Sequence, residues 1–329
     1  MQGNDPRHWA PFEKLDPTQG TIVRQPPGEG PGYWAGAPGA MYDPQSKKFY
    51  LTYRLRRPRG VEPDRGAEVH IASSSDGINF DDIWSATKDQ VDSTSIERSA
   101  LVRLSDGTWR MYTSYVNPTD RRWLISLFEA DSPDKFDLRS AKPVLTAADI
   151  GAEGVKDPFV FNIAGLYHMV VSYAIKAADS AMAGNASADD MHGTNDAYNT
   201  GLILSCTGLA TSHDGIDWRW EGPIMKPDPN AWDCYCARIG TLWYQPPVWL
   251  AFYDGSTDVS ENYEERCGLA YSSDLRTFHR VTPNGPLLKT PQGVGAMRYF
   301  DVVQSPDGTF IYYEMAQPDG SHDMRVLRV

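Results

Sequence analysis

The sequence predicts an all-β fold, a five-bladed β-propeller, and three observations lead to this prediction. Short apolar runs that end in a tyrosine recur at steps of 62, 58, 80 and 60 residues. A second motif, Ala-x-Ser-x-Asp, follows four of these runs at a similar distance. We find no stretch of ten or more residues with a convincing helical period. The marker tyrosines of the five units are Tyr53, Tyr115, Tyr173, Tyr253 and Tyr313.

Each unit contains the signals of three or four short antiparallel strands joined by polar turns. A hairpin precedes each marker tyrosine, and the Ala-x-Ser-x-Asp motif supplies the next turn, as in Asp76-Gly77 and Asp214-Gly215. Units of about 60 residues fit four-stranded propeller blades. Two packed β-sandwiches are the alternative all-β fold, but they explain five tyrosines in register less well. The blades are expected at about residues 35–84, 97–139, 155–221, 233–281 and 295–329.

The two ends of the chain are predicted to meet in the last blade. Its third strand, near residues 324–329, is followed by nothing, so the fourth strand must come from elsewhere. Thr21-Ile-Val-Arg24 is the candidate, and it would close the ring. We therefore expect an N-terminal extension over residues 1–34, with a closing strand near 21–24, and a single propeller domain over 35–329.

The composition disfavours some classes of partner and of site. A net charge of −12, from 43 acidic and 31 basic residues, argues against nucleic acid or a membrane surface as the partner. No secretory signal or bilayer-spanning run is visible, so a cytoplasmic location is expected, and a secreted form whose signal was removed stays open. Four cysteines without CxxC spacing predict buried free thiols. No metal and no cofactor are expected.

Polar and charged residues are concentrated where the innermost strands should converge at the mouth of the propeller. Counting sixteen residues back from each marker tyrosine places Ala37, Ser99, Asp157, Ala237 and Met297 in one register. The alternative to a functional site is that these charged residues lie in solvated loops at the starts of the strands. The candidates near this register are Glu97, Arg98, Asp157, Asp233, Tyr235, Arg238 and Arg298.

Arg98, Arg238 and Arg298 suggest recognition of an anion, because a guanidinium offers a planar fork that suits carboxylate or phosphate. A phosphate, a uronate or a sugar phosphate would fit. Salt bridges to Glu97, Asp157 and Asp301 are the structural alternative.

A polar insertion over residues 177–201 lengthens the third unit. It carries His192 with Asp189 and Asp190, a set that suits metal binding or proton transfer, with a solvated loop as the alternative.

The third unit carries a resemblance to known families. Gly154-Val-Lys-Asp157-Pro158-Phe-Val-Phe161, with the run ending at Tyr173, resembles the Asp-Pro blade motif of five-bladed propeller glycosidases. These are the arabinanase/xylosidase family 43, the invertase family 32 and the mannoside phosphorylase family 130. The repeated Ala-x-Ser-x-Asp-Gly-x-x-Trp strand is similar to theirs as well. The resemblance spans residues 35–329 and singles out none of the three. It implies that carboxylates from successive blades act on one sugar at the mouth.

The resemblance assigns roles to particular residues. Asp157 matches a position that is a catalytic acid in the phosphorylases and stabilises the transition state in the invertases. Glu97 is the expected second carboxylate, with Asp233 and Asp254 as reserves. Ala37 stands where the hydrolases usually have an aspartate, a departure from the hydrolytic pattern. The expected substrate- or anion-binding residues are Arg98, Arg238, Arg298, Asp233, Tyr235, Trp34 and His192.

The leading hypothesis is a carbohydrate-active enzyme that cleaves a glycosidic bond at the central pocket, most simply a glycoside hydrolase. An inverting glycoside phosphorylase that uses phosphate is the first alternative. A catalytically inactive sugar-binding propeller is the second, and Ala37 is compatible with it. The expected partner is a sugar or oligosaccharide, in one variant with an anionic group. The sequence leaves open the sugar, its anomeric configuration and the oligomeric state.

Overall fold

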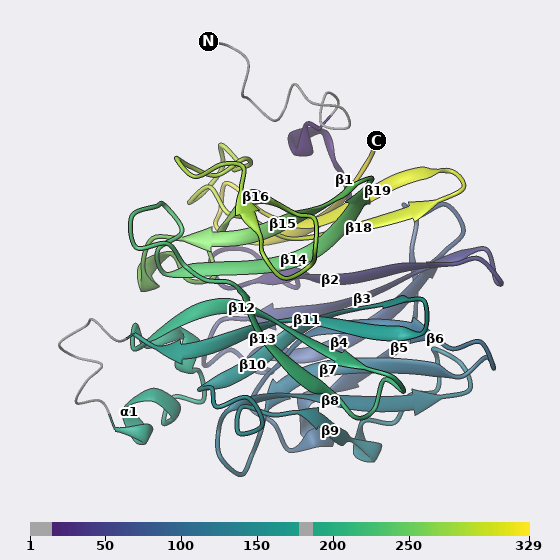
Figure 1. The fold of residues 1–329 in the computed structure, drawn as a ribbon, viewed down its shortest axis with the longest axis horizontal. Helices are drawn as coiled ribbons and strands as arrows, with labels where there is room; N and C mark the ends of the chain where they lie inside the picture. The colour runs from purple at the N-terminus through teal and green to yellow at the C-terminus, as the bar shows by residue number, and fades with distance from the viewer. Residues whose placement is uncertain (1–14, 178–186) are drawn as a thin grey trace.

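The computed structural model describes residues 15–177 and 187–329 as a fold built almost entirely of short antiparallel strands (Figure 1). Four sheet units contain four strands in chain order, each paired with the next. They are β2 (Trp34–Asp43), β3 (Lys48–Arg57), β4 (Arg65–Ser74) and β5 (Asp81–Thr87); β6 (Ile96–Arg103), β7 (Trp109–Val116), β8 (Trp123–Ala130) and β9 (Lys142–Leu145); β10 (Gly154–Ile163), β11 (Leu166–Lys176), β12 (Ile203–Ser212) and β13 (Arg219–Met225); and β14 (Cys236–Gln245), β15 (Val248–Ser256), β16 (Arg266–Ser272) and β17 (His279–Arg280).

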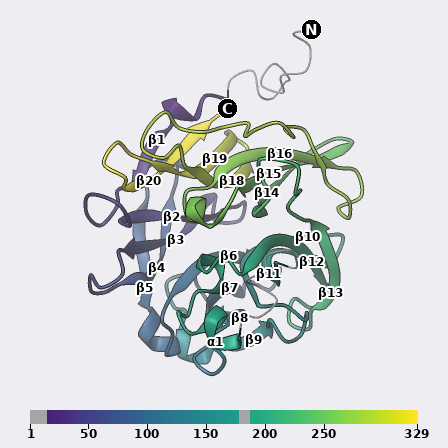
Figure 2. The ribbon, with the colours of Figure 1, turned by 90° about the vertical axis from the view of Figure 1, so that its left-hand side faces the viewer.

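The last unit contains strands from both ends of the described chain. β18 (Met297–Ser305), β19 (Gly308–Ala316) and β20 (His322–Arg328) follow in order, and β1 (Thr21–Arg24) pairs antiparallel with β20, with Thr21 opposite Val326. Figure 2 shows β1 beside β20. The hydroxyl of Tyr313 donates a hydrogen bond to the Pro17 carbonyl just before β1. The N-terminal residues 1–14 of the expected extension lie outside the described residues.

The first strands of the five units contact one another in a cycle. β2 contacts β6 and β18, β10 contacts β6 and β14, and β14 contacts β18. Figure 2 shows the units following one another around this centre. Single parallel bridges, Trp34 to His322 and Ser205 to Cys236, also join neighbouring units. The arrangement places the starts of all five first strands close together.

The recurring Ser-x-Asp motif builds the same turn in three units. The Ser74 hydroxyl donates to Asp76, whose carboxylate accepts the next two free backbone N–H groups, from Ile78 and Asn79. Asp214 and Asp274 make equivalent bonds. The same turn also connects units. The hydroxyl of Tyr312, in the last unit, donates a hydrogen bond at 2.8 Å to the carbonyl of Gly77, which follows Asp76 in the first unit. The motif therefore recurs because each blade needs a turn that satisfies its own backbone.

A β-bulge interrupts every first strand near its start. In four strands two residues stand opposite one partner residue, and in β14 one extra residue, Gly240, interrupts the ladder. Ala37, Asp157 and Tyr299 adopt positive φ angles of 53°, 57° and 54° at these bulges, a conformation that is uncommon outside glycine. The paired bulge residues are Ala37 with Pro38, Glu97 with Arg98, Asp157 with Pro158, and Tyr299 with Phe300.

The bulges correct the register that was counted from the marker tyrosines. Glu97 and Tyr299 are equivalent to Ala37 and Asp157, whereas the count of sixteen selected Ser99 and Met297. The count failed for two reasons. The turns between first and second strands differ in length, from five residues after β6 to two after β18. The marker tyrosines also differ in place, since Tyr313 stands opposite the bulge of β18, whereas Tyr173 stands two residues beyond the partner of the bulge of β10.

The remaining elements are short. The insertion in the third unit contains α1 (Ala188–His192) and the 3-10 turn η6 (Ala197–Asn199), and its residues 178–186 lie outside the described part of the chain. None of the helices in the described ranges is long and apolar enough to cross a membrane. The other 3-10 turns are η3 (Pro17–Gln19), η4 (Lys88–Val91), η5 (Leu138–Ser140) and η7 (Val259–Glu261).

Closure of the ring by β1 can be tested by truncation. We expect removal of residues 1–25 to lower the melting temperature by roughly 5 °C or more, because β20 would become an unpaired edge strand. Thermal unfolding followed by circular dichroism would measure the change. Removal of residues 1–14 alone, which leaves β1 in place, is the matched control. Equal melting temperatures for the full chain and the longer truncation would contradict the closing role of β1.

Candidate functional site

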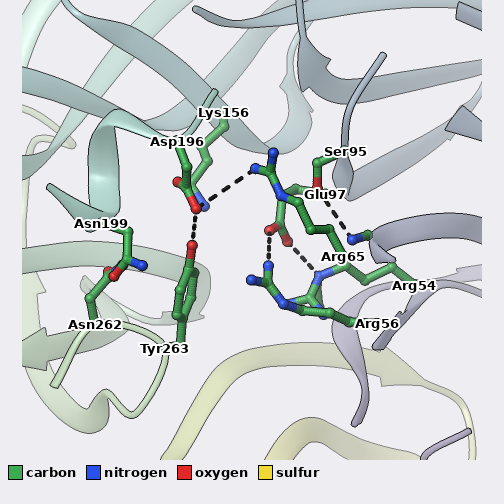
Figure 3. A network of polar contacts seen from close by, with 12 residues as sticks. Arg54, Arg56, Arg65, Ser95, Glu97, Lys156, Asp196, Asn199, Asn262 and Tyr263 are labelled. Atoms are coloured by element: carbon green, nitrogen blue, oxygen red, sulfur yellow. Dashed lines mark hydrogen bonds and ion pairs between the residues drawn. The ribbon is translucent and has the colours of Figure 1, made fainter. Parts of the chain in front are cut away.

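A cluster of buried charged side chains lies where the first strands begin. Arg54 of β3 and Glu97 of β6 are each 1% exposed, and the Arg54 Nε donates a hydrogen bond to Glu97. Arg56 Nη1 lies 3.5 Å from the second Glu97 oxygen (Figure 3). Burial alone would raise the pKa of Glu97, but Arg54, Lys156 and Arg56 outweigh it and hold this pKa below its usual value. Glu97 is therefore anionic at neutral pH.

The charges continue from Glu97 around the centre with alternating sign. Arg298 lies between Glu314, at 2.6 Å, and Glu265, at 2.7 Å, and Arg238 donates to the other oxygen of Glu265. Arg238 also lies 3.8 Å from Asp254. A buried ion is tolerated when counter-ions and hydrogen bonds replace the water it has lost. Arg54, Glu314 and Asp254 lie in the second strands β3, β19 and β15, and Glu265 directly precedes β16. The network therefore joins units one, two, four and five.

One carboxylate of this network takes up protons more readily than the rest. Burial is the main cause that raises the pKa of Asp254, to about 7; Glu265 adds to the effect, while Arg238 opposes it. One Asp254 oxygen accepts a hydrogen bond from the backbone N–H of Tyr299 at 2.9 Å. Near neutral pH, Asp254 is thus divided between its acid and its carboxylate forms.

His322 connects the network to an aromatic platform. Its Nδ1 lies 2.7 Å from Glu314 and its Nε2 lies 3.0 Å from Glu264. Burial would lower the pKa of His322, but its two glutamate partners raise it. The Trp34 ring stacks on the imidazole at 4.9 Å, and the guanidinium carbons of Arg298 and Arg56 lie 5.1 and 4.9 Å from the centre of the same indole ring.

Asp157 is the exception to this pairing. The bulge of β10 directs a carboxylate that is 6% exposed into the site, and neither of its oxygens has a hydrogen-bond partner among the described residues. Lys156 Nζ lies 3.6 Å from Oδ2, and its ammonium group also lies over the rings of Trp123 and Tyr198. Desolvating a carboxylate without hydrogen bonds is costly, so such a group is a candidate for a role in function.

Tyr299 stands at the centre of the site and was missed by the sequence analysis. The guanidinium carbons of Arg298, Arg54 and Arg238 lie 5.1, 5.9 and 5.9 Å from its ring centre. Burial and the negative charges of Asp157 and Glu97 raise its pKa, so the phenol stays protonated. Aligning the paired residues before the apolar run of each unit, instead of counting back from the tyrosine, would have found it.

Loops from three units meet beside this cluster. Asp196, next to η6, accepts a hydrogen bond from the Tyr263 hydroxyl and lies 3.7 Å from Arg65 (Figure 3). Asn262 and Asn199 form a 3.4 Å contact, and the Tyr263 ring lies 4.4 Å from the guanidinium carbon of Arg56. Segments of units one, three and four thus meet beside the site.

The three arginines singled out in the sequence all have protein partners. Arg98 is 1% exposed and bonds the carbonyls of Pro38, at 2.7 Å, and Gly240, and it lies 3.0 Å from Asp301. Arg98 therefore ties units one, four and five together. The pairing of Arg98 with Asp301 is the structural alternative stated above, while Glu265 and Glu314, the partners of Arg238 and Arg298, were not expected.

The other candidates lie around the cluster. Asp233 is fully buried and accepts a hydrogen bond from Arg280 at 2.7 Å. The Tyr235 hydroxyl donates to the Tyr198 carbonyl. His192 is buried rather than solvated, and its Nε2 lies 2.9 Å from Glu153. Within residues 15–177 and 187–329 no three potential metal ligands come together.

Comparison with known proteins identifies the fold. No family model matches the sequence, and no curated protein matches it. Among solved structures, the GH43_1 enzyme from Xanthomonas citri is similar with a TM-score of 0.60 and 13% identity, over 94% of this chain and 90% of that one. A glycosyl hydrolase from Bacteroides ovatus is similar with a TM-score of 0.60 and 15% identity, over 96% of each chain.

A third similar structure comes from the GH130 family of mannoside phosphorylases, described as containing glycoside hydrolases that target β-1,2 mannosidic linkages in Candida mannan. It has a TM-score of 0.59 and 15% identity, over 94% of each chain. At these identities the likeness establishes the fold alone. The chain therefore shares its five-bladed propeller fold, over nearly its whole length, with glycoside hydrolases and phosphorylases of families 43 and 130.

The raised pKa of Asp254 predicts a specific pH dependence of stability. Because the folded state binds this proton more tightly than the unfolded state does, the stabilisation is present at low pH and is lost as the pH rises to about 7. The side chain of Asp254→Asn cannot titrate. We therefore expect the unfolding free energy of the variant, relative to that of the wild type, to be roughly 2–3 kcal/mol higher at pH 8 than at pH 5. Urea unfolding of both proteins at the two pH values measures this difference, and parallel pH profiles would contradict the assignment.

Proposed function

We propose that the protein is a carbohydrate-active enzyme that cleaves a glycosidic bond at the central site, most simply a glycoside hydrolase. The observation that carries the proposal is the Asp157 carboxylate, which is buried yet has no hydrogen-bond partner among the described residues. The shared fold supports a sugar as the ligand, since the GH43_1 enzyme from Xanthomonas citri has been solved with xylose and with xylotriose.

The chemistry requires protonation of the departing glycosidic oxygen and attack at the anomeric carbon. Asp157 is the candidate proton donor or charge stabiliser at the reacting bond, because neither of its oxygens accepts a hydrogen bond from the described residues. Glu97, held anionic by Arg54 and Arg56, suits stabilisation of the positive charge that develops on the sugar. Asp254 can supply or accept a proton near neutral pH and remains the reserve acid.

A phosphorylase is the second candidate, and Ala37 favours it. The bulges of units two and three bring the carboxylates Glu97 and Asp157 to the site, whereas the first bulge brings only a methyl group. Phosphate would serve as the nucleophile without a carboxylate that activates water. An inactive sugar-binding protein is the third candidate. Turnover of a panel of glycosides with and without inorganic phosphate separates the three. Turnover without phosphate supports the hydrolase, phosphate-dependent turnover supports the phosphorylase, and binding without turnover supports the sugar-binding protein.

The role of Asp157 is tested by Asp157→Asn. We expect the rate constant kcat to fall by about 100-fold or more, because the change removes the proton donor or charge at nearly constant volume. The melting temperature should change little, since removing a buried, poorly solvated charge offsets the loss of its ion pair with Lys156. Kinetics on the glycoside found in the panel and thermal unfolding of the same protein measure both effects.

Asp43→Asn is the matched control. Asp43 is also a buried carboxylate of a first strand, but it lies at the far end of β2 and is paired with Arg103. We expect this variant to lose stability and to keep its kcat. An unchanged rate in Asp157→Asn would remove Asp157 from the catalytic machinery.

A further inference from the structure

The buried guanidinium of Arg54 has hydrogen-bond donors for which the described residues supply no acceptor. Its Nε is bonded to Glu97, but neither Nη1 nor Nη2 has a hydrogen-bond partner among the described residues. Glu314 Oε2 lies 4.0 Å from Nη2, beyond hydrogen-bond distance. Burial would lower the pKa of Arg54, but Glu97 and Glu314 raise it, so the guanidinium stays charged. Two terminal nitrogens without acceptors are a costly feature in a side chain that is 1% exposed.

The first bulge reaches the same glutamate as this guanidinium. The Ala37 N–H donates to Glu314 Oε2 at 3.3 Å, and this is the same oxygen that lies 4.0 Å from Arg54 Nη2. The equivalent bulge positions in units two and three carry the carboxylates Glu97 and Asp157. The first bulge thus carries a methyl group where units two and three carry a carboxylate, and it is linked to Arg54 through Glu314 Oε2.

The surrounding groups are donors and flat apolar surfaces. Trp34 Nε1 is buried and has no hydrogen-bond partner among the described residues, and the Trp34 ring packs against Arg56, Arg298 and His322. Arg56 reaches the same glutamate as Arg54, Glu97, so the two guanidinium groups lie side by side. A ligand that satisfies this surface must supply acceptors to Arg54 and Trp34 and must tolerate a second cation. A neutral hydroxyl meets these needs less well than an oxyanion does.

We propose that Arg54, Arg56 and Trp34 form a subsite for the carboxylate of an acidic sugar residue. The planar fork of Arg54 can bind both oxygens of one carboxylate, and the indole N–H of Trp34 can donate a further hydrogen bond to it. A monoanion suits this position better than a phosphate dianion, because Glu97 and Glu314 lie beside it. That the ligand is a sugar rests on the proposed function, whereas binding of the carboxylate can be measured without turnover.

The experiment is a thermal-shift titration of the full chain at constant ionic strength. The probes are glucuronate and galacturonate, the neutral sugars glucose and galactose, and inorganic phosphate. We expect at least one uronate to raise the melting temperature saturably, by roughly 5 °C at a hundredfold excess over its Kd. The neutral sugars are expected to give a smaller shift at the same concentration.

Variants assign the effect to the fork. Arg54→Lys keeps the charge and removes the planar fork, so it should lose most of the uronate-induced shift. Arg98→Lys is the matched control, since Arg98 is equally buried and makes several bonds, but all of its surroundings are protein. It should lose stability and keep the shift. If Arg54→Lys does not fold, Trp34→Phe removes only the indole donor and should weaken uronate binding several-fold.

The outcomes separate this inference from the proposed function. A uronate shift that disappears in Arg54→Lys, or weakens in Trp34→Phe, supports the subsite even if no glycoside is cleaved. A shift produced by phosphate alone, an equal shift by neutral sugars, or a uronate shift that both variants retain overturns it. Turnover of neutral glycosides without any uronate binding would also overturn it and would leave the proposed function standing.

Discussion

Charge pairing at the centre of the ring is the constraint on which the rest of the structure depends. Four of the five first strands carry buried charged residues near their starts, and an unpaired buried ion is strongly destabilising. Glu97, Arg54 and Glu314 connect units two, one and five, and Arg98 adds bonds to backbone carbonyls of units one and four. Each unit therefore needs its neighbours in place before its own charges are satisfied, which couples blade packing to ring closure.

The β-bulges of the first strands present different side chains to the site. A bulge interrupts the ladder near the start of each first strand, and three of the bulge residues share a positive φ. The same backbone feature thus presents different side chains in different units. Here the positions carry a methyl group at Ala37, carboxylates at Glu97 and Asp157, and a phenol at Tyr299. This combination departs from a pair of carboxylates alone and adds three guanidinium groups around the phenol.

Some charged groups of the site have all their hydrogen-bond partners, and others lack them. The second kind indicates where the site functions. Arg298 is bonded to two glutamates and is explained by the fold. Asp157 and the fork of Arg54 are buried to a similar degree but lack hydrogen-bond partners among the described residues. Groups that cost stability without returning contacts are typical of sites that have been retained for binding or chemistry. The loops that carry Asp196 and Tyr263 are joined by a hydrogen bond and contact Arg56 and Trp34 beside these groups.

The sequence alone determined what depends on local pattern: the repeat of five units, the turns, the candidate closing strand and the placement of Asp157 at the mouth. These follow from strand alternation, turn chemistry and the Asp-Pro signature. Only the tertiary structure decided the register of Glu97 and Tyr299, because hairpins of unequal length and marker tyrosines at different distances from the bulge defeat a fixed count. It also decided the partners of the central arginines. Arg54 and Glu314 lie in second strands, where the sequence shows no special feature, and the ring brings them together across 260 residues of chain.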